Sequence, residues 1–122
     1  MLEGDFYTVK NPLLEEDSIR ALLEINPAHE IFKGHFPGQP VVPGVCMMQI
    51  VKELLQKSTG KQLRLRHGQD LKFLSVIDPE KNNLVQAEAN YSLLATGDIN
   101  VTARLFFNET TFFKFKGVFT ES

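Results

Sequence analysis

The chain has 122 residues, and its formal net charge is −2 at pH 7. This length suits one domain of ordinary size, so we expect a single domain over residues 1–122. Hydrophobic residues make up 43 % of the chain and charged residues 23 %, a globular composition that argues against disorder. The weakly acidic charge gives no sign of a nucleic-acid partner.

The chain has one cysteine, Cys46, so an internal disulfide is excluded. Residues 1–20 are neither basic nor continuously apolar, and they do not have the pattern of a secretory signal. No apolar run approaches the ~20 residues that a membrane-spanning helix needs. We therefore expect a cytoplasmic location and no membrane partner.

Two short strands are predicted at the start of the chain, over residues 5–11 and 18–26. The acidic segment 12–17 between them is typical of a turn. Residues 27–44 follow, and they include Pro37, Pro40 and Pro43. Each proline fixes its own φ and restrains the preceding residue toward extended geometry, so we expect a stiff loop without regular structure.

A helix is predicted over residues 45–58, because apolar side chains cover most of its circumference. Only a narrow polar stripe remains, formed by Gln49, Glu53 and Gln56 at positions i, i+4 and i+7. A helix this apolar is expected to be buried on most sides. Gly60 is a suitable residue to end it.

Four further strands are predicted, over residues 61–78, 84–94, 99–107 and 111–119. In the last of them Phe113, Phe115 and Phe119 lie on one side, and Lys114 and Lys116 lie on the other. Two strands, one buried helix and four meandering strands predict an α+β fold. A long antiparallel sheet wrapped around one central helix satisfies this order.

The segment GHFPGQPVVPGV, residues 34–45, resembles the signature of the hot-dog-fold β-hydroxyacyl-acyl-carrier-protein dehydratases of fatty acid synthesis. The resemblance is dense over residues 31–48, and the order of strands agrees along almost the whole chain. It implies the hot-dog fold. It also implies a reaction, the reversible removal of water from a 3-hydroxyacyl thioester to give the trans-2-enoyl thioester.

This reaction needs a base, a group that stabilises negative charge, and an acid. The resemblance implies that His35 is the base that removes a proton beside the thioester carbonyl, a task that its near-neutral pKa suits. Backbone N–H groups at a helix N-terminus suit the developing oxyanion. Gly44 supplies such a group, and its lack of a Cβ lets the thioester approach. Phe36, Pro43 and Val45 are the further substrate contacts that the resemblance implies.

The acid is the point at which this sequence departs from the family pattern. The family places Glu or Asp fourteen residues after the histidine, and here that position is Gln49. An amide donates a hydrogen bond, but it does not deliver a proton at neutral pH. Glu53 lies one helical turn further on the same face, where many family members have glutamine. Either Gln49 or Glu53 is therefore expected to face the substrate hydroxyl.

These polar residues also have structural interpretations. Gln49 would then bond to a neighbouring strand, and Glu53 would pair with Lys52 or Lys57 at the helix surface. Cys46 on the buried helix is interpreted as a core residue. The three histidines and this cysteine show no metal-ligand spacing, so we expect no metal and no cofactor.

A basic cluster lies near the loop and the end of the helix. It is interpreted either as a solvated face or as a receptor for an acidic carrier protein or a phosphopantetheine phosphate. The cluster consists of Lys33, Lys57, Lys61, Arg64 and Arg66.

The resemblance implies a homodimer or a trimer of dimers, because each site takes histidine from one chain and the helix acid from another. The substrate would be an acyl thioester bound to acyl carrier protein or to CoA. One alternative is a catalytically weakened acyl-binding subunit, or a heterodimer partner whose site is completed by an active paralogue. Another is a hot-dog acyl thioesterase, which would need a water-activating carboxylate that Gln49 does not supply.

Overall fold

The computed structural model of the chain describes residues 1–34 and 40–122. Two of the predicted site residues, His35 and Phe36, lie outside the described residues. No helix in the described residues is long and apolar enough to cross a membrane.

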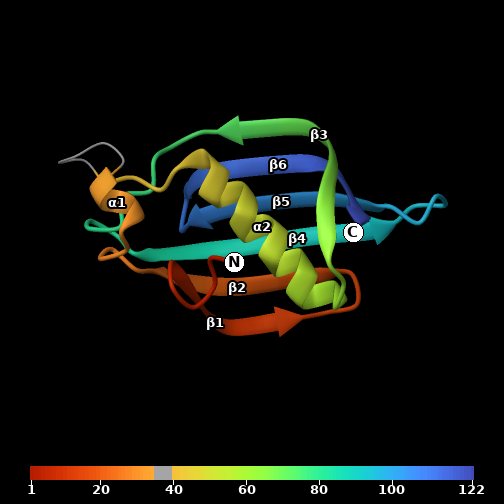
Figure 1. The fold of residues 1–122 in the computed structure, drawn as a ribbon, viewed down its shortest axis with the longest axis horizontal. Coiled ribbons are helices and arrows are strands. Elements are labelled where there is room, and N and C mark those ends of the chain that lie inside the picture. The colour runs from red at the N-terminus through yellow and green to blue at the C-terminus, as the bar shows by residue number, and fades with distance from the viewer. Residues whose placement is uncertain (35–39) are drawn as a thin grey trace.

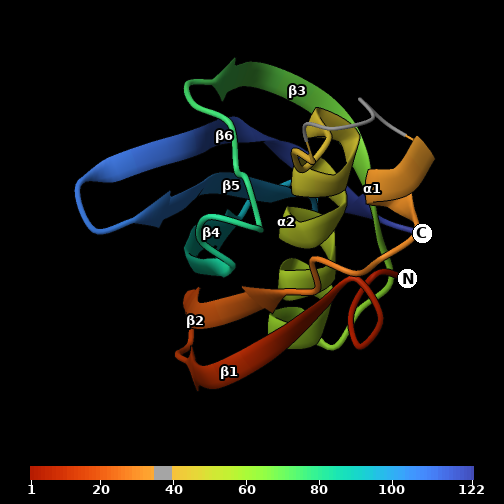
Figure 2. The same cartoon turned by 90° about the vertical axis from the view of Figure 1, so that its left-hand side faces the viewer.

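The described residues form a single antiparallel sheet with one long helix across it. The elements in chain order are β1 (Tyr7–Leu14), β2 (Ser18–Ile25), α1 (Ile31–Gly34), α2 (Gly44–Thr59), β3 (Leu63–Phe73), β4 (Leu84–Leu93), β5 (Ile99–Phe107) and β6 (Thr110–Glu121). The strands lie in the order β1-β2-β4-β5-β6-β3. Helix α2 crosses the sheet diagonally (Figure 1), and the sheet curves around it (Figure 2). This arrangement confirms the predicted α+β fold with one central helix.

The core lies between α2 and the concave face of the sheet. On α2 the buried residues are Cys46, Met47, Ile50, Val51, Glu53, Leu54 and Leu55. On β6, Phe113, Phe115 and Phe119 are buried, whereas Lys114 and Lys116 are exposed. The alternation predicted for the last strand is therefore confirmed. Its phenylalanines lie on the face of the sheet that contacts the core, and its lysines lie on the opposite, exposed face.

The predicted loop over residues 27–44 is wrong in two places, one inside it and one at its C-terminal end. Residues 31–34 form the short helix α1, because the buried Phe32 stacks on Phe6, with their ring centroids 5.4 Å apart. Gly44 already belongs to α2, since no proline follows Pro43 and the Pro43 carbonyl accepts the first N–H bonds of the helix. Gly60 ends α2 as predicted, in a left-handed conformation with φ of 72°.

Two strand predictions also need correction. β1 continues through the predicted turn to Leu14, because a register shift between Lys10 and Leu13, with Asn11 at φ 49°, lets the strand pass Pro12. Proline is tolerated there because β1 is an edge strand. The four later strands are not a simple meander, since β3 ends at Phe73 and pairs with β6 rather than with β4.

Candidate active site

The N-terminal end of α2 carries three of the predicted site residues, Pro43, Gly44 and Val45. The hydrogen bonds of the helix begin with the N–H groups of Cys46 and Met47, which both donate to the Pro43 carbonyl. Within residues 1–34 and 40–122, no acceptor receives the N–H of Gly44 or Val45. Among the described residues nothing competes for these two donors, which lie at the positive end of the helix dipole and suit an anion or a carbonyl oxygen.

An aromatic ring from β3 lies against this end of the helix. A Cβ atom on Gly44 would lie 2.9 Å from Cε1 of Phe73, so the glycine is needed for this contact. Phe73 keeps 52 % of its surface exposed, and Val45 keeps 75 %. The sequence gives no signal for Phe73, because nothing in a strand pattern indicates contact with a residue 29 positions earlier in the chain. The helix N-terminus is therefore flanked by two exposed apolar side chains.

Glu53 is the polar residue of α2 with the most complete set of partners. It is only 1 % exposed, and its carboxylate accepts four hydrogen bonds. The donors are the N–H groups of Leu2 at 2.8 Å and Glu3 at 2.9 Å, the Tyr7 hydroxyl at 3.0 Å and the Gln49 amide at 2.8 Å. A buried carboxylate with four donors is well satisfied, so its position is fixed from several directions.

The predicted surface pairing of Glu53 with Lys52 or Lys57 is wrong. The N-terminal segment folds over α2 and supplies the donors instead, and Lys57 pairs with the Glu3 carboxylate at 3.1 Å. The predicted bond from Gln49 to a neighbouring strand is also wrong, since its amide donates to Glu53 on the same helix. Position i+4 on one helix face explains this contact.

The hydrogen bonds to Glu53 determine whether its side chain is charged. Burial by itself would raise the pKa of Glu53, but the donors from Leu2, Gln49, Glu3 and Tyr7 favour the charged form, and the net effect lowers the pKa. Burial and the charge of Glu53 together raise the pKa of Tyr7. Glu53 is therefore ionised at neutral pH, and an ionised carboxylate has no proton to give to a leaving hydroxyl.

The other candidate groups have mainly structural surroundings. Cys46 is buried as predicted, and burial raises the pKa of its thiol, which makes it a poor nucleophile. Among the described residues, no group of three or more His, Cys, Asp or Glu side chains could hold a metal ion. In the predicted basic cluster, Lys57, Lys61 and Arg66 form ion pairs with carboxylates of this chain.

Comparisons with known proteins point to one family. The family model described as ApeI-like, ApeI dehydratase, matches residues 11–116. The 3-hydroxyacyl-[acyl-carrier-protein] dehydratase FabZ of Haemophilus influenzae (strain PittEE) is 29 % identical over 62 residues, which are 51 % of this chain and 42 % of that protein. FabZ of Wolbachia pipientis wMel is 31 % identical over 77 residues, with 57 % and 54 % covered. The chain thus spans about half the length of the curated relatives it matches.

Solved structures show the same fold. The dehydratase heterocomplex ApeI:P from Xenorhabdus doucetiae superposes with a TM-score of 0.71 at 21 % identity, over 85 % of this chain and 88 % of that one. Cj0977, a sigma28-regulated virulence protein from Campylobacter jejuni, superposes with a TM-score of 0.73 at 11 % identity, over 98 % and 85 %. The predicted hot-dog fold is confirmed.

Proposed function

Because the chain belongs to the ApeI-like dehydratase family, we propose that it removes water from a 3-hydroxyacyl thioester to give the trans-2-enoyl thioester. The thioester is carried by acyl carrier protein or by CoA. His35 is the base, and the N–H groups of Gly44 and Val45 stabilise the charge on the thioester oxygen. These two N–H groups at the start of α2 have no acceptor within residues 1–34 and 40–122, which supports this assignment.

The environment of Glu53 indicates how fast this chain works by itself. This residue is the only carboxylate in α2, and it is enclosed by four donors that keep it ionised. We therefore assign Glu53 a structural role, in which it holds the N-terminal segment against the helix. Gln49 takes the place of the family acid, so α2 offers no proton donor and turnover by the chain alone is slow.

The edge of the sheet suggests how two copies associate. β3 is an edge strand, and ten of its eleven residues are exposed, among them the apolar side chains of Leu65, Leu71 and Phe73. An unpaired edge of this kind is a ready template for pairing with another chain. We propose that two copies join through β3, so that each site takes His35 from one copy and position 49 from the other.

A second candidate function follows from the presence of Gln49 in place of the family acid. In a heterodimer with a paralogue that carries the acid, the site that uses His35 of this chain would be complete, and the site that uses Gln49 would not. The structurally similar ApeI:P dehydratase from Xenorhabdus doucetiae is itself a heterocomplex, which supports this candidate. A thioesterase has less support, because water activation needs an accessible carboxylate and Glu53 is buried among its donors.

His35→Ala tests the assignment of the base. We expect it to abolish formation of the enoyl thioester from 3-hydroxybutyryl and 3-hydroxydecanoyl carrier protein, because a positioned base typically contributes ~10²–10⁴-fold. Product is measured by mass spectrometry of the acyl carrier protein. Circular dichroism and the melting temperature should match those of the native chain. Retention of the native rate would show that another group is the base.

A further inference from the structure

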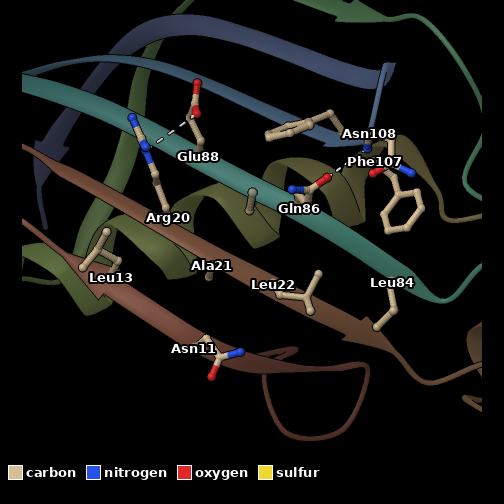
Figure 3. Close-up of a pocket in the computed structure, with 12 residues that line it drawn as sticks. Asn11, Leu13, Arg20, Ala21, Leu22, Leu84, Gln86, Glu88, Phe107 and Asn108 are labelled. Carbon is tan, nitrogen blue, oxygen red and sulfur yellow. Dashed lines mark hydrogen bonds and ion pairs between the residues drawn. The ribbon is translucent and has the colours of Figure 1, made fainter.

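A row of charged side chains crosses the face of the sheet that lies opposite α2. In the strand register Arg20 stands opposite Glu88, Glu88 opposite Arg104, Arg104 opposite Lys114, and Lys114 opposite Lys72. The first part of the row alternates in sign. Arg104 Nε donates to Glu88 at 3.0 Å, and Arg20 Nε lies 3.9 Å from the same carboxylate. Figure 3 shows Arg20 and Glu88 on this face, with α2 behind the strands.

The second part of the row places three cations next to one another. Arg104, Lys114 and Lys72 come from the adjacent strands β5, β6 and β3. Neighbouring strands lie ~4.8 Å apart, and like charges directly opposite each other destabilise a sheet. Lys72 has Asp70 at 3.5 Å, whereas Lys114 forms no ion pair in the part of the chain that the structure describes. Fold stability alone therefore does not explain this arrangement.

The same side chains line a hollow of about 390 Å³. Four cations and two carboxylates line it, and the two carboxylates are already paired with two of the cations. Among the described residues the lining of the hollow therefore has an excess of two positive charges, although Asp70 also stands opposite Lys116 in the strand register. Its charged and polar lining comprises Asp70, Lys72, Glu88, Asn90, Thr102, Arg104, Lys114 and Lys116.

We propose that this hollow binds the diphosphate group of a small soluble molecule. A diphosphate carries at least two negative charges, which the two excess positive charges of the lining balance, and lysine binds phosphate as a point charge. Arg104 is held in place by Glu88 and by the ring of Phe106, 3.8 Å from its guanidinium carbon, so it needs little ordering on binding. The hollow and α2 lie on opposite faces of the sheet, which separates this site from the candidate active site.

Pyrophosphate is the probe that tests this site. We expect calorimetry at low ionic strength to show that the native chain binds it, with an affinity that falls as salt is added. Lys114→Gln should weaken binding at least about tenfold, because it removes the central cation of the row. Its melting temperature without ligand should equal or exceed that of the native chain, since a repulsion is removed. Lys10→Gln on the far edge strand β1 is the matched control and should bind normally.

Three results would overturn the site: no binding by the native chain, equal weakening by both lysine variants, or binding to anionic vesicles or acidic proteins without binding to pyrophosphate. His35→Ala should bind pyrophosphate as the native chain does. Failure of this site is therefore distinguishable from failure of the proposed dehydration.

Discussion

Gln49→Glu is expected to raise the dehydration rate of the chain by ~10²–10⁴-fold, the range that a general acid contributes. The Gln49 amide nitrogen lies 2.8 Å from a Glu53 oxygen, so the new carboxyl would lie beside a carboxylate that three other donors keep ionised. A neighbouring negative charge raises the pKa of a carboxyl group. The new side chain would therefore keep its proton near neutral pH, which is the form that an acid catalyst needs. Initial rates with 3-hydroxydecanoyl carrier protein measure the effect.

Gln56→Glu is the matched control for this substitution. Gln56 belongs to the same polar stripe, and its side-chain oxygen accepts the Leu63 N–H at 2.8 Å, a bond that a carboxylate also accepts. This variant should keep the slow native rate. If Gln49→Glu is as slow as the native chain while its melting temperature is unchanged, the missing acid is not at position 49.

Glu53→Gln is expected to lower the free energy of unfolding by about 2–4 kcal/mol. An amide has one acceptor oxygen in place of two, and its NH₂ group would face donors, so at least one buried N–H or O–H loses its partner. Urea unfolding measures the difference. Glu3→Gln is the control, because the Glu3 side chain makes only a half-exposed pair with Lys57 while its backbone N–H still reaches Glu53. We expect a change of at most ~1 kcal/mol for the control.

The same network predicts the pH dependence of stability. The pKa of Glu53 is lowered in the folded chain, whereas an unfolded glutamate titrates near ~4.3. Its contribution is therefore fully present above that value and is lost as the pH falls through the folded pKa. The native chain should lose stability in acid more steeply than Glu53→Gln. Parallel stability curves for the two chains would mean that Glu53 is not held in its ionised form.

The elements that were predicted correctly depend on local patterns. The apolar helix α2 and the alternation in β6 each follow from periodicity within one segment. The partner of β3 could not be predicted in this way, because the choice of β6 over β4 is made across the sheet. The extension of β1 past Pro12 depends on a bulge at an edge, which no local pattern indicates.

In the candidate site, too, features that depend on a local motif could be predicted, and features that depend on distant contacts could not. The family and the position of Gln49 were recognisable from a dense local motif, and the family assignment is confirmed. The environment of Glu53 was not predictable, since two of its donors are backbone N–H groups 51 and 50 residues earlier in the chain. Any residue type at positions 2 and 3 except proline supplies such donors, so the sequence carries no mark of them.

If one active site joins His35 of one copy to position 49 of the other, two defective chains should restore each other. The native chain lacks the acid, and the double variant His35→Ala/Gln49→Glu lacks the base. Random pairing of equal amounts makes half of the dimers mixed, and one site in each mixed dimer combines His35 with Glu at position 49, about a quarter of all sites. We predict that the mixture turns over 3-hydroxydecanoyl carrier protein at about a quarter of the rate of Gln49→Glu alone. A mixture no faster than the average of its two components would contradict the shared site.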